Sequence, residues 1–106
     1  MDYAKDEIIT NAVKLIENLQ EKHSIKAAYL FGSYSKGFAG KNSDIDIAVV
    51  LDKIRDGSPF NETFEIFHEA QKYNSLYEVI CFSEQEFINE DESLIKHIKR
   101  EGIKIV

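Results

Sequence analysis

The residues with the clearest potential for chemistry are a glycine–serine pair and, ten residues later, two aspartates: Gly32-Ser33 and Asp44-Ile45-Asp46. In an extended strand, side chains two positions apart project from the same face, about 6 to 7 Å apart along the chain. Two carboxylates at that separation repel each other by about 2 to 3 kcal/mol at an effective dielectric constant of about 20, which favours a cation between them. Mg²⁺ is commonly held by one or two carboxylates, with water and substrate phosphate at its other positions. The pattern therefore predicts a site for a metal and a nucleotide.

The segment between the two pairs has the composition of a loop that approaches a ligand closely. Residues 32–43 include three of the five glycines and three serines. From Lys22 to Ser43 the chain has four lysines and no acidic residue, although its net charge is −6. This basic stretch is where a triphosphate could be attracted. In the alternative interpretation, Asp44 is a turn residue and Asp46 lies on a solvated sheet face.

The elements around this loop follow from the periodicity of the apolar residues. Three- and four-residue spacing predicts a helix over 2–21, and β-branched and aromatic residues or strict alternation predict strands over 25–31 and 44–51. A second helix is expected to start at Ser58-Pro59 and to bury Phe60, Phe64, Phe67 and Ala70. The remaining expected elements are a strand over 76–82, a short helix capped by Ser83 and Glu86, a helix that ends at Gly102, and a strand over 103–106. This order indicates an α/β or α+β fold, with helices packed against one small mixed β-sheet.

Length and composition limit the function classes. The 106 residues are expected to form one domain over 1–106, and the net charge of −6 argues against general nucleic-acid binding and against an anionic membrane surface. No apolar run approaches the roughly 20 residues of a membrane span, and the first residues lack the apolar segment of a signal peptide. The single cysteine, Cys81, predicts no internal disulfide. We therefore expect a cytoplasmic protein in which any phosphate contact is local.

The spacing of Gly32-Ser33 and Asp44-Ile45-Asp46 resembles the signature of nucleotidyltransferases of the DNA polymerase β superfamily. The short chain, Gly37 in the loop, the run 43–50 and the ending 99–103 are similar to the minimal nucleotidyltransferases of that superfamily. The resemblance implies the nucleotidyltransferase fold and a nucleoside triphosphate substrate. Many minimal nucleotidyltransferases are antitoxins encoded beside a HEPN-domain toxin, and some transfer AMP from ATP to a toxin tyrosine. The resemblance thus implies an antitoxin role and a HEPN-toxin partner.

The resemblance also implies roles for the residues of the motif. Asp44 and Asp46 would hold two Mg²⁺ ions that bridge the triphosphate of ATP. Gly32 would let the backbone approach the nucleotide, and Ser33 would hydrogen-bond its phosphates. The lower-ranked nucleotide-binding candidates are Ser43, for which turn stabilisation is the alternative, and Lys36, for which an exposed solubilising lysine is the alternative.

Glu78 is the candidate for a third metal-binding and catalytic carboxylate. It interrupts the apolar strand predicted over 76–82, where a buried glutamate needs a partner to offset the cost of burying its charge. The resemblance implies a carboxylate on a following strand that completes the metal site facing the acceptor hydroxyl. The family has aspartate more often at this position, and an ion pair at the edge of the sheet is the alternative for Glu78.

Other motifs are less informative. The spacing from Gly32 to Gly37 is that of a P-loop, but Phe38-Ala39 replace its lysine and its serine or threonine, which excludes a Walker site. The histidines and the cysteine lack zinc-site spacing and are expected to be ordinary packing or surface residues: His23, His68, His97 and Cys81.

The function expected from the sequence is Mg²⁺-dependent nucleotide transfer to a protein hydroxyl, with ATP as the donor. Without a second domain to enclose a small molecule, the acceptor must be recognised in an exposed groove beside the metals, which suits a protein acceptor. Two alternatives stay open. The chain could be a binding module that neutralises its partner by contact alone, or a small catalytic subunit that works with a separate substrate-binding chain, as part of an oligomer.

Overall fold

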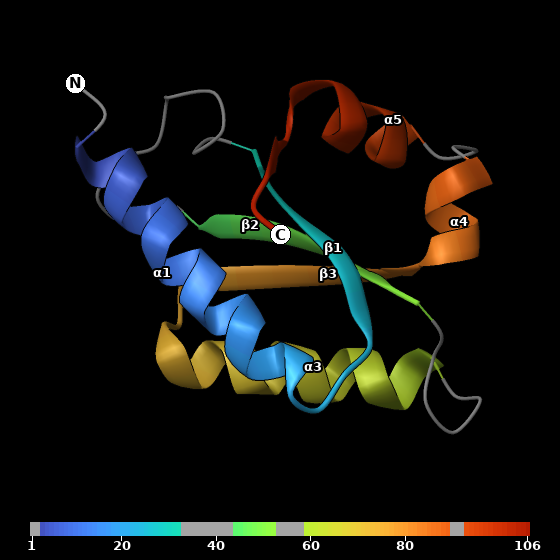
Figure 1. Ribbon diagram of the computed structural model, residues 1–106, viewed down its shortest axis with the longest axis horizontal. Coiled ribbons are helices and arrows are strands. Elements are labelled where there is room, and N and C mark those ends of the chain that lie inside the picture. The colour runs from blue at the N-terminus through green and yellow to red at the C-terminus, as the bar shows by residue number, and fades with distance from the viewer. Residues whose placement is uncertain (1–2, 33–43, 53–58, 90–92) are drawn as a thin grey trace.

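The computed structural model describes residues 3–32, 44–52, 59–89 and 93–106 (Figure 1). Its elements in chain order are α1 (Tyr3–Gln20), β1 (Ile25–Phe31), β2 (Ile45–Leu51), α3 (Pro59–Tyr73), β3 (Tyr77–Ser83), α4 (Glu84–Asn89), α5 (Ser93–Glu101) and β4 (Ile103–Lys104). The order predicted from periodicity is confirmed for these elements, with small differences at their ends. The fold is the expected small mixed β-sheet packed with helices.

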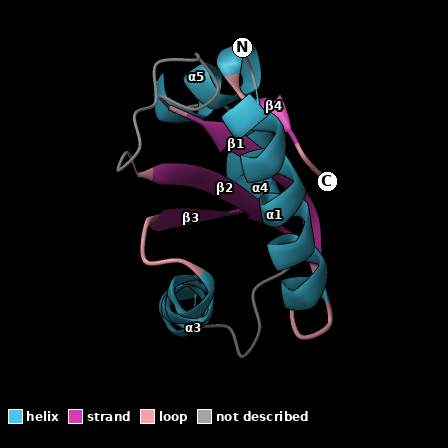
Figure 2. Cartoon of the chain, turned by 90° about the vertical axis from the view of Figure 1, so that its left-hand side faces the viewer, coloured by secondary structure: helices cyan, strands magenta, loops and turns pink. Residues whose placement is uncertain are grey.

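The four strands form one sheet in the order β3-β2-β1-β4. β1 pairs antiparallel with both β2 and β4, whereas β2 and β3 are parallel and are connected through α3. Figure 2 looks along α3 and shows β1, β2 and β3 side by side. This topology places the end of β1 next to the beginnings of β2 and β3. The glycine that follows β1 and the acidic residues of the other two strands therefore meet where these strands begin or end, on one side of the sheet.

Both faces of β2 are covered, and the alternation of its side chains divides them as predicted. The first face carries Ile45, Ile47, Val49 and Leu51, which pack with apolar residues of α1 and α3 such as Leu15 and Ile66. The second face carries Ala48 and Val50, which pack with residues of α4 and α5 such as Phe87 and Ile98. Figure 1 shows α1 and α3 to one side of the sheet and α4 and α5 to the other. Asp46 alternates with Ala48 and therefore belongs to the second face.

The buried side of α3 differs from the prediction. Of the residues that we expected in the core, Ala70 is buried and Phe67 is half-buried, but Phe64 is 52% exposed. Glu62 and Ile66, which continue the four-residue spacing of Ala70, are buried instead. The helix therefore buries a side that is offset from the expected one, and this side includes the Glu62 carboxylate, whose partner His23 is also buried. The side chain of Phe60 lies outside the described residues.

The short helix α4 begins with the predicted capping box. The backbone N–H of Ser83 donates to the Glu86 carboxylate at 2.9 Å, and the N–H of Glu86 donates to the Ser83 hydroxyl at 3.1 Å. These two bonds satisfy amide groups that have no partner within the first turn. Within the described parts of the chain, every helix is too short or too polar to span a lipid bilayer.

Candidate active site

The glycine at the end of β1 supports an aspartate of β2. Gly32 has a φ of +76°, a conformation that residues with a side chain rarely adopt. A Cβ added to Gly32 would overlap Oδ2 of Asp46 and lie 3.2 Å from its Cγ. Only glycine leaves room for the Asp46 carboxylate at this position. This close contact at Gly32 is with a side chain of the protein itself, and the approach of its backbone to a nucleotide stays a prediction.

The register of the sheet aligns Asp46 with Glu78. Asp46 is opposite Glu78 of the parallel strand β3 and opposite Phe31 of the antiparallel strand β1. Residues that face each other across neighbouring strands project to the same side of the sheet, so the two carboxylates lie on one face. Asp44 immediately precedes β2, two positions before Asp46, and its side chain is exposed. Three acidic residues therefore gather where β2 and β3 begin.

The charges of these three residues interact. Partial burial raises the pKa of Asp46 above its ordinary value of 3.8, and the negative charges of Glu78 and Asp44 raise it further. The two neighbouring carboxylates thus make the ionised form of Asp46 less favourable. A cation among them would relieve this repulsion, and hard oxygen ligands favour Mg²⁺ over softer metals.

The donor set fits a metal that is shared with a substrate. Among the described residues, no group of three His, Cys, Asp or Glu side chains is close enough to hold a metal ion by itself. Mg²⁺ usually keeps several water ligands and binds through one or two carboxylates together with substrate phosphates. Asp46 and one neighbouring carboxylate provide such an incomplete set, in which the nucleotide would supply further oxygens.

The environment of Glu78 differs from the one that we expected from the sequence. We expected a buried glutamate that requires a partner, but the Glu78 side chain, near the beginning of β3, is exposed, whereas Phe82 on the same face of β3 is buried against Phe87 of α4. The cost of burying its charge therefore does not arise. Within the described residues, Glu78 forms no ion pair with a cationic side chain, so the alternative role as an ion-pair residue has no support there. Three other candidate residues, Ser33, Lys36 and Ser43, lie outside the described residues.

A second polar cluster, which the sequence interpretation missed, lies on the opposite face of the sheet. His23 is 5% exposed and Glu62 is 3% exposed, and Nδ1 of His23 donates a hydrogen bond to Oε2 of Glu62 at 2.6 Å. The other ring nitrogen lies 3.4 Å from the Glu65 carboxylate. This pair joins the turn after α1 to the first turn of α3. The four-residue spacing of Glu62, Ile66 and Ala70 is the signal from which its burial could have been inferred.

Cys81 lies near this cluster on β3. Burial raises the pKa of its thiol to about 12, the neighbouring Glu62 charge contributes to the increase, and a hydrogen bond with Thr63 counteracts part of it. A thiol with such a pKa is a poor nucleophile at neutral pH. The structure thus agrees with the expectation that Cys81 is a packing residue.

Comparison with known proteins adds an independent line of evidence. A family model described as "Polymerase beta, Nucleotidyltransferase" matches residues 13–106. A protein of Methanocaldococcus jannaschii, named as a candidate protein adenylyltransferase, is 38% identical over 58 residues. That match covers 55% of this chain and 57% of the relative, so it spans little more than half of either protein.

Solved structures show the same fold. A candidate nucleotidyltransferase from Sulfolobus solfataricus superposes with a TM-score of 0.63 at 18% identity, covering 94% of this chain and 80% of that chain. A chain from the complex of a tri-AMPylated Shewanella oneidensis HEPN toxin with an MNT antitoxin superposes with a TM-score of 0.59 at 19% identity, covering 96% of this chain and 71% of that chain. At these identities the likeness establishes the architecture.

Proposed function

Because the chain belongs to the polymerase β nucleotidyltransferase family, we propose that it transfers a nucleotide from Mg²⁺-bound ATP to a hydroxyl group of a partner protein. The observation that carries the proposal is the convergence of Asp44, Asp46 and Glu78 at one edge of the sheet, with Gly32 making room for Asp46. Neighbouring negative charges that raise the pKa of Asp46 form a site that favours a divalent cation and the phosphates it carries.

In this proposal each residue has a distinct task. Asp44 and Asp46 would hold two Mg²⁺ ions, and Gly32 leaves room for the Asp46 carboxylate. When bound, the metal ions neutralise the phosphate charge and polarise the α-phosphate. Glu78 contributes the carboxylate nearest the open edge of the sheet, from which a protein acceptor can approach. Ser33, Lys36 and Ser43 contact the phosphates.

The reaction is an in-line displacement. The acceptor oxygen forms a bond to the α-phosphorus, the bond from that phosphorus to the bridging oxygen breaks, and pyrophosphate leaves. The acceptor proton passes to solvent or to the exposed Glu78 carboxylate. The chain contributes mainly position and electrostatics, because phosphoryl-type transfer requires no covalent bond to the enzyme.

The proposed donor is ATP and the proposed acceptor is a tyrosine of a HEPN toxin, which makes the chain an antitoxin. Two comparisons support this choice: the Methanocaldococcus relative is named for adenylyl transfer to protein, and the Shewanella complex contains an AMP-modified HEPN toxin. An exposed site at a sheet edge also suits a protein acceptor, which brings its own surface to cover the site.

The test is incubation with α-labelled ATP, Mg²⁺ and the product of the adjacent gene. Wild-type protein is expected to label that product, and mass spectrometry is expected to place AMP on a tyrosine. Asp44→Asn/Asp46→Asn is expected to abolish labelling, whereas Asp52→Asn, an exposed aspartate beyond the far end of β2, should retain it. A tight complex with the partner and no transfer of label would favour neutralisation by contact alone. Labelling of a small molecule only when both chains are present would favour a shared catalytic subunit.

A further inference from the structure

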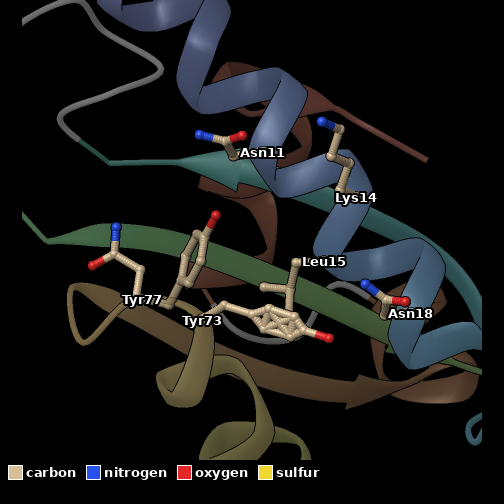
Figure 3. Close-up of a pocket in the computed structure, with 7 residues that line it drawn as sticks. Asn11, Lys14, Leu15, Asn18, Tyr73 and Tyr77 are labelled. Atoms are coloured by element: carbon tan, nitrogen blue, oxygen red, sulfur yellow. The ribbon is translucent and has the colours of Figure 1, made fainter.

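A groove of about 410 Å³ lies between α1 and the end of α3, on the face of the sheet opposite the carboxylates. Its lining comes from α1, from the last residue of α3 and the residue after it, and from the first residue of β3: Asn11, Lys14, Leu15, Asn18, Tyr73, Asn74 and Tyr77. Figure 3 shows the side chains of α1 on one side of this groove and the two tyrosines on the other. Its volume is within the range of about 300 to 1,000 Å³ that is typical of small-molecule sites.

The Tyr77 hydroxyl is available to a ligand in this groove. Tyr77 is 3% exposed, and its hydroxyl makes no hydrogen bond to a described residue. Among the described side chains, no fully buried polar atom lacks a partner, so the small accessible part of Tyr77 includes its oxygen. Since Tyr77 lines the groove, that oxygen opens into it. A nearly buried hydroxyl in this position is a specific donor for a ligand.

The remaining lining determines the ligand class. Asn11 and Asn18 supply amide groups, each of which can pair with the edge of a purine through two hydrogen bonds, and Asn74 offers its amide nitrogen, because its Oδ1 accepts from the backbone N–H of Leu76. Tyr73 is 51% exposed and offers a ring face on which a planar base can stack. Lys14 contributes one positive charge, and the described lining contains no carboxylate. One cation without acidic ligands suits a single phosphate group and does not suit a metal-bound triphosphate.

We propose that this groove binds a purine nucleoside monophosphate without a metal ion. The base stacks on Tyr73 and is read by the asparagine amides, and the phosphate pairs with Lys14. Tyr77 donates its hydroxyl to the ligand from the floor of the groove. Tyr77 directly precedes Glu78 in β3, so the two side chains lie on opposite faces of the sheet. The groove is therefore separate from the carboxylate site, and this proposal does not depend on the proposed transferase activity.

The test is calorimetric titration of the full chain with AMP in EDTA, with adenosine and inorganic phosphate as separate titrants. AMP is expected to bind, and adenosine and inorganic phosphate are each expected to bind more weakly than AMP. Tyr77→Phe removes only the hydroxyl and is expected to raise the Kd of AMP about 2- to 10-fold, as is Lys14→Met. The matched controls are Tyr29→Phe, on the other face of the sheet, and Lys72→Met, an exposed lysine outside the lining. Both controls should leave the Kd unchanged.

Three results would overturn the proposal. The first is the absence of AMP binding at millimolar concentration. The second is AMP binding that Tyr77→Phe and Lys14→Met leave unchanged while both proteins melt like wild type. The third is AMP binding that disappears in Asp44→Asn/Asp46→Asn, because the nucleotide would then occupy the carboxylate site. Binding in EDTA that survives the double aspartate substitution and weakens in Tyr77→Phe supports the groove.

Discussion

The carboxylate of Asp46 occupies the space that a side chain at Gly32 would fill. The two residues come from antiparallel neighbouring strands, and Phe31, which precedes Gly32, is the register partner of Asp46. Gly32 therefore has two requirements that exclude other residues: a φ of +76° and an empty Cβ position. The structure therefore requires glycine at position 32 of the motif whether or not a ligand is bound.

Gly32→Ala is expected to reduce both stability and activity. The positive φ costs an alanine about 1 to 2 kcal/mol, and displacement of the Asp46 carboxylate by about 1 Å would lower transfer about 100-fold. Chemical denaturation and label transfer measure the two effects. Ser83→Ala, which removes the α4 cap at a cost of about 0.5 to 2 kcal/mol, is the control for lost stability alone. Equal label transfer by the two variants would show that Gly32 does not position Asp46.

Asp46→Asn is expected to raise the melting temperature at neutral pH. Burial and the charges of Glu78 and Asp44 raise the folded-state pKa of Asp46 above 3.8, so the unfolded chain loses this proton first as the pH rises. The ionised Asp46 side chain therefore lowers the free energy of unfolding, and this loss grows as the pH rises from 3.8 through the raised folded-state pKa of Asp46. Melting curves at several pH values should show an advantage of the variant at pH 7 that shrinks toward pH 3.8.

Asp52→Asn controls for the general effect of removing one negative charge from a chain of net charge −6. This exposed aspartate follows β2 at the end away from the carboxylates. If Asp46→Asn and Asp52→Asn changed the melting temperature equally at every pH, the carboxylate cluster would not be the cause.

His23→Ala is expected to destabilise the fold by about 3 to 5 kcal/mol, because the Glu62 carboxylate stays buried after the imidazole at 2.6 Å is removed. Urea denaturation measures the loss. The double substitution His23→Leu/Glu62→Leu should recover much of the stability, since it removes both polar groups. His97→Ala, whose partly exposed ring lies 3.7 Å from Glu101, should cost less than about 1 kcal/mol. A loss below 1 kcal/mol for His23→Ala would contradict a structural role for the pair.

Cys81 is expected to react slowly with iodoacetamide in the folded protein. Its thiol pKa of about 12 leaves very little thiolate at pH 8, and the side chain is only partly accessible. Mass spectrometry after timed alkylation measures the rate, and the unfolded chain in urea serves as the reactive reference. Equal rates in the two states would contradict the buried position of the thiol.

The helices and strands were largely predictable because their apolar periodicity is local. β1 and the alternating faces of β2 follow the sequence pattern, and so does the capping box of α4. The orientation of α3 was not predictable in this way, because the Glu62 partner lies 39 residues away along the chain. A local pattern favoured the aromatic side of the helix, whereas the side that is buried includes the hydrogen-bond partner of a distant histidine.

The candidate site was predictable in its residue types and only partly in its surroundings. The two-residue period places Asp44 and Asp46 together, but the alignment of Asp46 with Glu78 depends on the parallel pairing of β2 and β3. The exposure of Glu78 was not predictable either, because a single strand does not reveal the strand order or the helices that cover each part of the sheet. The groove beside Tyr77 combines α1 with the α3–β3 connection, and no local motif marks it.

The most direct test of the account measures binding of a non-hydrolysable ATP analogue by calorimetry, with Mg²⁺ and with EDTA. The wild-type chain is predicted to bind the analogue far more tightly with Mg²⁺, and Asp44→Asn/Asp46→Asn is predicted to lose at least about 100-fold of that affinity, equivalent to about 2.7 kcal/mol. Equal affinity for the analogue in EDTA, or a double variant that retains the Mg²⁺-dependent affinity of the wild type, would contradict a metal-dependent nucleotide site at Asp44 and Asp46.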